Sequence, residues 1–217
     1  MSSNRRAFLK FGLAGTAVLG GLSQLLKLSP HEFNERITRK LLGASRLAPT
    51  FARDQAREPR ENGGIGLDEE VGDWSLKIEA PGVATRTMLI DEVKALPRVE
   101  MTTELMCIEG WSEVVHWTGT PLSNLAPLNA PEYVSLVTPD QAYYVGLDLE
   151  SALHPQTLLA WEMNGQALSS EHGAPLRLVI PVKYGIKSIK RVGSIHFGTD
   201  RPKDYWAERG YDWYSGL

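Results

Sequence analysis

Residues 98–111 read RVEMTTELMCIEGW and contain the only cysteine of the 217-residue chain. Alternate positions differ in character, because glutamates and Thr102 occupy one set and mainly apolar residues the other. The mainly apolar set is Val99, Met101, Thr103, Leu105 and Cys107. This period of two predicts a half-buried strand whose last inward-facing residue is Cys107. Gly110 then follows, where the backbone leaves room for another group to approach closely.

A free cysteine is often only a small buried hydrophobic residue, but the N-terminus argues for more. Residues 5–10 read RRAFLK, which resembles the twin-arginine export motif, and residues 11–26 are mainly apolar. A charged region followed by an apolar one is typical of a targeting signal, and this one is short and glycine-rich for a membrane span. We therefore expect residues 1–30 to be a twin-arginine signal peptide of a periplasmic protein, either cleaved or retained as a membrane anchor.

Export changes the interpretation of Cys107. An unpaired thiol in an oxidising compartment has no disulfide role, so it is better explained as a ligand or a catalytic group. The twin-arginine route is also known for carrying proteins that fold around a cofactor before export. A cofactor-bound Cys107 is the leading hypothesis.

Composition and charge limit the class of protein. The chain carries a formal charge of −3, and residues 1–30 hold Arg and Lys but no Asp or Glu, so the remainder is more acidic. This charge disfavours a nucleic-acid-binding role. We expect a lead-in segment and loop over residues 31–73, and one domain with a substantial core over residues 74–217.

Many short strands and few helices are expected in that domain. Strands are predicted over residues 74–78, 88–90, 99–107, 114–117, 133–138, 143–149, 157–163, 176–180 and 187–197. Turns are predicted at residues 81–82, 119, 139–141 and 164–165, the last an Asn-Gly pair that suits a type I′ hairpin. Asp91 is expected to cap a helix over residues 92–96, and Pro121 to open a helical turn. The pattern indicates a mainly antiparallel α+β fold.

Two further stretches are rich in cations. Residues 170–193 hold the cations Arg177, Lys183, Lys187, Lys190 and Arg191 beside a histidine and several glycines. Such lysines either protect a sheet edge or line a concave anion site that the backbone can approach. The loop at residues 52–66 holds Arg53, Arg57, Arg60 and Asn62, and it is either a solvated connector or a segment lying across an anion.

Several ordered blocks together resemble a known family. HPQTLLAWEMNG at 154–165, HGAPLR at 172–177 and KSIK at 187–190 resemble the molybdopterin-binding domain of the sulfite oxidase family. CIEGW at 107–111 and WTGTPL at 117–122 resemble its exported bacterial branch, which includes methionine-sulfoxide-reductase subunits. The resemblance implies the α+β, mainly antiparallel fold of that molybdopterin-binding type.

The resemblance also implies a cofactor and a set of site residues. Cys107 would be the protein ligand to molybdenum, beside the dithiolene sulfurs of one molybdopterin, and a soft thiolate suits that metal. Tyr143 would lie at the substrate site, and its neighbour Tyr144 is the alternative residue for that position. The cofactor-binding residues implied by the resemblance are Arg60, Asn62, Thr138, His172, Arg177, Lys183, Ser188, Ile189 and Lys190.

Residues after the ligand cysteine bear on the substrate. Sulfite-oxidising members have a basic element there, whereas this chain has Ile108, Glu109 and Trp111. If Glu109 faces the metal it repels anionic sulfite, which favours reduction of a neutral S-oxide or N-oxide; alternatively it faces solvent or caps a backbone amide. His172 is the sulfite-oxidase residue at its position, so the chain combines features of both subgroups, and sulfite oxidation is the alternative function.

Partners and rival classes follow from what else the sequence holds. With one cysteine there is no haem-attachment motif, so electrons must be exchanged with another protein, which in this family is a membrane haem subunit. A different class, an exported cysteine hydrolase or transpeptidase, would use Cys107 as nucleophile with a histidine base. A zinc protein and a non-catalytic periplasmic binding domain complete the alternatives.

Overall fold

The computed structural model describes residues 32, 35–36, 46–60, 63–67 and 72–217. The described residues from Arg46 onward belong to one compact unit, which contains both sheets. The expected signal peptide and Asn62 lie outside the described residues. Among the residues that are described, no helix is long and apolar enough to span a membrane.

The first sheet has the strand order β2-β1-β10-β5-β6. Its strands are β1 (Leu76–Ala80), β2 (Val83–Met88), β5 (Tyr133–Val137), β6 (Tyr144–Asp148) and β10 (Ser194–Gly198). The β1–β10 pair is parallel and the other pairs are antiparallel. The last strand of the described chain therefore lies in the middle of the sheet, between its earlier strands.

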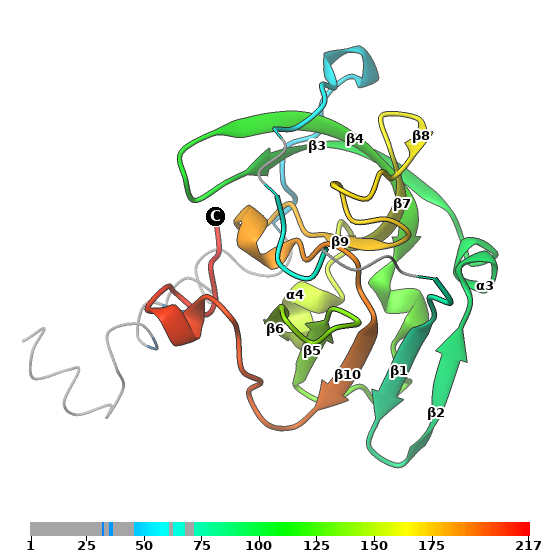
Figure 1. The fold of residues 1–217 in the computed structure, drawn as a ribbon. Coiled ribbons are helices and arrows are strands. Elements are labelled where there is room, and N and C mark those ends of the chain that lie inside the picture. Colours follow the sequence, from blue (N-terminus) through cyan, green and yellow to red (C-terminus); the bar gives the residue numbers. More distant parts are fainter. Residues whose placement is uncertain (1–31, 33–34, 37–45, 61–62, 68–71) are drawn as a thin grey trace, which may run out of the picture. The chain divides into compact units, whose positions relative to one another are not determined.

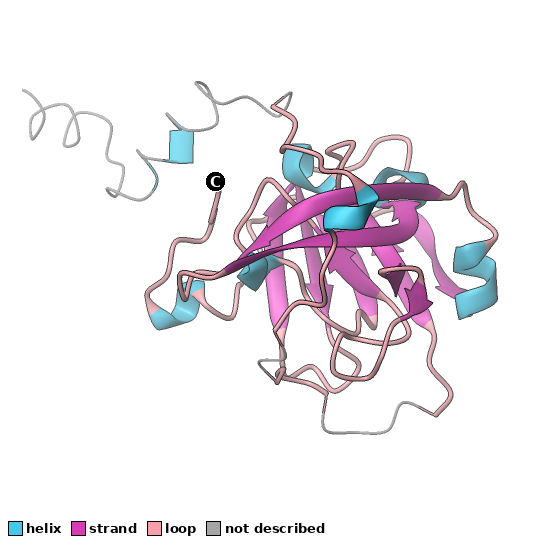
Figure 2. Cartoon of the chain, turned by 90° about the horizontal axis from the view of Figure 1, so that it is seen from above, coloured by secondary structure: helices cyan, strands magenta, loops and turns pink. Residues whose placement is uncertain are grey.

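The second sheet has the order β3-β4-β7-β8, and β9 also pairs with β7. Its strands are β3 (Val99–Met106), β4 (Ser112–Pro121), β7 (Leu158–Met163), β8 (Gln166–Ala167) and β9 (Arg177–Val179). All of its pairs are antiparallel. The β3–β4 ribbon lies above the strands of the first sheet in Figure 1, and Figure 2 shows the same ribbon from above.

Helices are short and few in the described chain. They are η1 (Arg53–Gln55), α3 (Ile90–Lys94), η2 (Leu122–Leu125), α4 (Leu149–Ala152), η3 (Gly185–Lys187) and η4 (Ala207–Arg209). The predicted α+β, mainly antiparallel fold is confirmed. Helix η3 lies in the predicted cationic stretch of residues 170–193.

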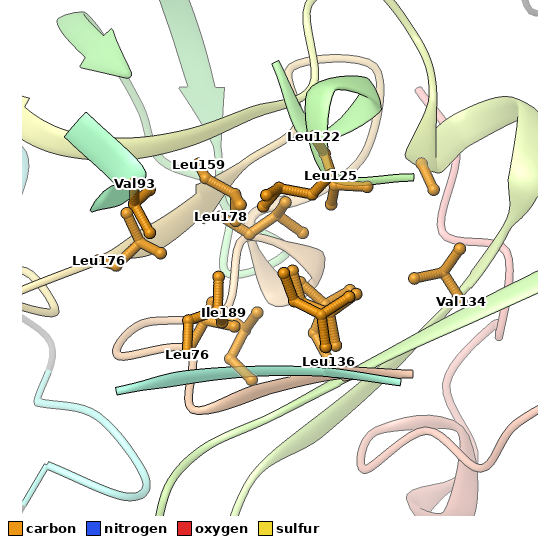
Figure 3. Close-up of a cluster of buried hydrophobic side chains, with 14 of the residues drawn as sticks. Leu76, Val93, Leu122, Leu125, Val134, Leu136, Leu159, Leu176, Leu178 and Ile189 are labelled. Atoms are coloured by element: carbon orange, nitrogen blue, oxygen red, sulfur yellow. The ribbon is translucent and has the colours of Figure 1, made fainter. Parts of the chain in front are cut away.

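The hydrophobic core lies between the two sheets. Leu76 and Leu136 of the first sheet lie on one side of the buried cluster, and Leu159 and Leu178 of the second lie on the other (Figure 3). Burying such side chains fully contributes roughly 1.5–3 kcal/mol each. Ile189 belongs to the same core and is 1% exposed, so the segment after η3 is anchored between the sheets.

Two predicted hairpins are confirmed. Strands β5 and β6 pair across residues 138–143, and β7 and β8 pair across Asn164 and Gly165. Asn164 has φ of 53° and Gly165 has φ of 83°, and a type I′ turn requires positive φ at both positions. The helical turn that follows Pro121 is also confirmed, as η2.

Gly119 was predicted to form a turn, but it lies within β4. A Cβ atom there would stand 2.3 Å from the carbonyl oxygen of Leu159 on the neighbouring strand. The register between β4 and β7 shifts between Thr118 and Gly119. Glycine is needed here because two backbones approach closely at an irregularity, which is one of the uses of glycine inside strands.

Three other boundaries also differ from the prediction. The strand expected at 88–90 ends at Met88, and Ile90 begins α3. The N-cap of α3 is Leu89 rather than Asp91, and the Glu92 carboxylate accepts a hydrogen bond from the Leu89 N–H at 2.7 Å. The strand expected at 187–197 is shorter, because η3 ends at Lys187 and β10 begins at Ser194.

Candidate active site

A cavity of about 590 Å³ lies where the end of β3 meets η3 and residues 59–60 and 63–65. Most of the residues that the family resemblance implied for the site line it. These are Arg60, Cys107, Tyr143, His172, Arg177, Ser188, Ile189 and Lys190. They come from segments far apart in the sequence, so it is the fold that assembles them.

Cys107 lies at the first residue after β3, in a tight turn that leads into β4. Its N–H donates to the Trp111 carbonyl at 2.9 Å, and its own carbonyl accepts from the Gly110 N–H at 3.1 Å. Gly110 has φ of 88°, which a side chain rarely adopts. The turn therefore holds Cys107 at the cavity wall.

The surroundings of Cys107 favour its protonated form. Burial raises the pKa of the thiol, and the charge of Glu109 raises it further. A thiolate at this position needs a positive group to stabilise it, and a bound soft metal ion would supply one. The site thus suits a cysteine that is a ligand better than one that is a free nucleophile.

Glu109 and Trp111 form the rim of the cavity beside Cys107. Both line it, together with Ile108. The indole Nε1 of Trp111 donates to Glu109 Oε2 at 3.0 Å, and Glu109 is exposed. The carboxylate is therefore held by an indole at the rim, where it is both part of the lining and in contact with solvent.

Arg177 provides a buried positive charge at another part of the lining. It is 3% exposed, its guanidinium donates to the carbonyls of His172 and Ser188 at 3.1 and 3.3 Å, and it lies 4.8 Å from the centroid of the Trp117 ring. Its Nε atom has no hydrogen-bond partner in the described part of the chain. Burial lowers the pKa of Arg177 to about 10. A buried guanidinium with an unused donor is suited to an anion.

His172 and Lys190 lie close to this charge. Burial lowers the pKa of His172, and the charges of Arg177 and Lys190 lower it further, so the imidazole is neutral at pH 7. Its Nε2 atom lies 3.5 Å from Glu58 Oε1. Gly173, with φ of 96°, allows the two segments to meet, since a Cβ there would lie 2.8 Å from the Lys190 Cα atom.

Tyr143 rather than Tyr144 lines the cavity. The Tyr143 hydroxyl donates to the Ile186 carbonyl of η3 at 2.6 Å. Burial raises the pKa of Tyr143, so its phenol stays protonated. Tyr144 instead donates to Glu208 and is not part of the lining.

Thr138 and Lys183 do not line this cavity. Thr138 accepts a hydrogen bond from the Tyr143 N–H at 3.1 Å and donates to Asp140 at 2.6 Å, so it helps to position Tyr143. Lys183 is buried 3.7 Å from an oxygen of Asp148, away from the lining. Its expected contact with the cofactor is not supported.

Trp206 and Tyr211 line the cavity but were not expected from the sequence. They belong to the segment that follows β10. Aromatic residues are evident in WAERGYDWY at 206–214, but no local pattern indicates that this segment returns to the turn that holds Cys107. Gly185 was also missed, and it allows η3 to pack against the end of β3, since a Cβ there would lie 3.3 Å from the Met106 carbonyl oxygen.

Comparisons with known proteins agree with this geometry. Residues 63–206 match the family model described as oxidoreductase molybdopterin binding domain. The chain is 34% identical to a protein of Azospira oryzae named putative protein-methionine-sulfoxide reductase subunit YedZ1, over 98% of this chain and 87% of that protein. It is 31% identical to the protein-methionine-sulfoxide reductase catalytic subunit MsrP of Campylobacter jejuni, over 98% of this chain and 80% of that protein.

More distant or partial likenesses concern the shared domain. MsrP of Xanthomonas campestris is 38% identical over 61% of this chain, and the match spans 47% of that protein, about half its length. The solved sulfane dehydrogenase SoxCD of Paracoccus pantotrophus aligns with a TM-score of 0.55 and 18% identity over 73% of this chain and 46% of that one. This second likeness concerns the fold.

The fold and the cavity define a molybdopterin-binding oxidoreductase. The chain belongs to the sulfite oxidase family of such enzymes, as the matched domain and its relatives show. Its cofactor is molybdenum with molybdopterin. The family therefore excludes the alternatives of a cysteine hydrolase or transpeptidase, a zinc protein and a non-catalytic binding domain.

Proposed function

We propose that this enzyme reduces a neutral sulfoxide in the periplasm, with electrons from a separate redox protein. The sulfoxide gives up its oxygen and takes two electrons and two protons, which yields a sulfide and one water molecule. Two relatives are named for the reduction of protein methionine sulfoxide. Such a residue, neutral at its sulfur, is the natural candidate among sulfoxides.

The lining of the cavity fits an anionic molybdenum cofactor. Arg177 has an unused donor, and Lys190 and Ser188 lie in the same lining, so these residues would hold a phosphate group. His172, neutral and buried, would bind the pterin. Cys107 would ligate the metal, because a soft thiolate suits molybdenum. When bound, the cofactor supplies the two-electron oxygen-atom chemistry, while the protein supplies position and electrostatics.

The protonated Tyr143 keeps a proton at its hydroxyl, in reach of the cavity. We assign it the role of a substrate-site donor, whose single proton would turn from the Ile186 carbonyl to the oxygen of the bound sulfoxide.

The observation that carries the substrate class is the Glu109 carboxylate at the rim beside Cys107. A negative charge there disfavours the approach of anions such as sulfite and leaves neutral oxides unaffected. Because Glu109 is exposed, solvent and salt screen this effect. The discrimination is therefore expected to be stronger at low ionic strength.

The test compares specificity constants for sulfite oxidation and dimethyl sulfoxide reduction, with dye acceptors and donors, in the wild type and in Glu109→Gln. The wild type should prefer the sulfoxide, and Glu109→Gln should narrow the difference. Glu113→Gln is the matched control, since Glu113 lies on the same ribbon but outside the lining. A wild type that prefers sulfite, or a ratio that Glu109→Gln leaves unchanged, contradicts the proposal.

Export and the electron partner belong to the same proposal. The RRAFLK motif at residues 5–10 supports the twin-arginine route. We expect Arg5→Lys combined with Arg6→Lys to leave the protein in the cytoplasm, and unimpaired accumulation in the periplasm would contradict this. The electron source is a separate carrier, with a membrane haem subunit as the expected one, and the name of the Azospira relative describes a subunit.

A further inference from the structure

A wall of aromatic rings extends from the cavity to the surface. Trp206 and Tyr211 line the cavity, and their ring centroids are 5.1 Å apart at an interplanar angle of 76°. Trp206 also meets Tyr205 at 5.3 Å, and Tyr205 meets Tyr143 at 5.1 Å. The first two contacts are edge-to-face and the third is tilted at 55°, and together they fix the rings relative to one another. We call Tyr205, Trp206 and Tyr211 the aromatic wall.

The aromatic wall is anchored by Asp204. Its Oδ1 atom accepts hydrogen bonds from the N–H groups of Trp206 and Ala207 at 3.2 and 3.1 Å. Its Oδ2 atom accepts from Lys187 Nζ at 2.5 Å and from the Gly146 N–H at 3.1 Å. Lys187 ends η3, whose Gly185 and Ile186 also line the cavity. One buried ion pair therefore connects the wall to η3.

The wall has an exposed end. Tyr211 is 46% exposed, one of the few large exposed rings of the described chain, and it lies outside the residues 63–206 that the family model matches. Tyr211 therefore presents ring surface both to the cavity and to solvent. The Arg209 guanidinium lies over the Tyr205 ring, 3.4 Å from its centroid, so Trp206 and Tyr211 are the rings of the wall that line the cavity. An apolar group of a bound molecule is the fitting occupant beside these two rings.

We propose that the aromatic wall determines substrate specificity by binding the apolar substituents on the sulfur of the sulfoxide. This inference rests on the proposed function and adds the part of the substrate that the enzyme recognises. Aromatic rings make favourable contacts with sulfur-bearing alkyl chains and with other rings. The wall thus favours sulfoxides with large apolar substituents over dimethyl sulfoxide.

The test uses methyl phenyl sulfoxide and dimethyl sulfoxide with the cofactor-loaded enzyme. In Trp206→Ala the ratio of the specificity constant for methyl phenyl sulfoxide to that for dimethyl sulfoxide is expected to fall about tenfold. The fall should come mainly from a higher KM for the aryl substrate. A tenfold change is the size expected for one good aromatic contact. Trp206→Phe should restore most of the ratio. Binding of methyl phenyl sulfide, measured by calorimetry, should weaken in parallel. Tyr133→Ala is the control, since Tyr133 packs against Trp213 but does not line the cavity.

The outcomes separate the two proposals. An enzyme that reduces neither sulfoxide contradicts the proposed function and this inference with it. If the wild type reduces both sulfoxides and Trp206→Ala leaves the ratio and the sulfide affinity unchanged, only the proposed role of the aromatic wall in specificity is refuted. A Trp206→Phe variant that loses as much selectivity as Trp206→Ala also refutes it, because the ring contact would then not be what matters.

Discussion

Lys187 donates a hydrogen bond from Nζ to Asp204 Oδ2 at 2.5 Å, and the two residues are 1% and 2% exposed. Removing one member of a buried ion pair leaves the other charge without compensation. We expect Lys187→Met to lower the free energy of unfolding by about 3–5 kcal/mol. Chemical denaturation monitored by tryptophan fluorescence measures this.

The double variant Lys187→Met with Asp204→Asn is the matched control for this pair. It removes both charges, so it should recover part of the stability that the single variant loses. A single variant within about 0.5 kcal/mol of the wild type would show that the pair has little effect, since that is the usual range for surface substitutions.

Gly173 allows the His172 turn to lie against Lys190. Gly173 has φ of 96°, and a Cβ atom added there would lie 2.8 Å from the Lys190 Cα atom. Gly173→Ala should therefore cost about 1–3 kcal/mol and reduce the bound pterin by displacing both residues. Gly82→Ala is the control, since Gly82 has φ of 70° but nothing within 4 Å. Equal pterin content in the two variants would contradict this account of Gly173.

Arg177 is predicted to be essential for holding the cofactor. Lysine cannot reproduce its planar set of donors, which reach two carbonyls and leave Nε unused. We expect Arg177→Lys to lose most of its pterin and molybdenum while its circular dichroism stays native. Arg86→Lys, on the exposed strand β2, should keep a full complement. Normal pterin content in Arg177→Lys would exclude the proposed role.

Buried histidines predict a loss of stability in acid. Burial lowers the pKa of His116 below its ordinary value of 6.5, and Arg53 adds to the effect while Glu100 opposes it. The unfolded chain then binds the proton more tightly, so this stability is present above pH 6.5 and is lost as the pH falls below that value. His154 and His172 shift in the same direction.

Thermal unfolding between pH 7 and pH 5 tests this prediction. The melting temperature should fall across that range, and His116→Asn should show a smaller fall than the wild type. His196→Asn, at an exposed position on β10, serves as the control. A pH dependence that is the same in His116→Asn and in the wild type would contradict the assignment.

Features that depend on a few residues adjacent in sequence were predicted correctly. The Asn164–Gly165 turn and the hairpin around residues 139–141 follow from backbone preferences of a few adjacent residues, and both formed as expected. Cys107 was correctly placed at the end of a strand. The predictions that were wrong concern positions whose neighbours are distant in sequence. Gly119 was predicted to form a turn, but glycine is needed there because the Leu159 backbone approaches it closely.

The same distinction holds for the site. His172, Arg177 and Lys190 lie in blocks that resemble a known family, and the structure brings them into one lining with Cys107. Trp206 and Tyr211 belong to a segment that Asp204 connects to Lys187 of η3, and no local pattern reveals this contact. Lys183 belongs to the cationic stretch by sequence but pairs with Asp148.

The most direct test of the central claim, that Cys107 binds the metal of a molybdopterin cofactor in this cavity, is X-ray absorption spectroscopy at the molybdenum edge. The protein is purified from a cofactor-competent host, as wild type and as Cys107→Ser. We predict molybdenum and pterin in both, with one sulfur ligand fewer and no turnover in Cys107→Ser, because a hard hydroxyl replaces a soft thiolate. The same number of sulfur ligands in the two proteins, or full turnover by Cys107→Ser, would contradict the account.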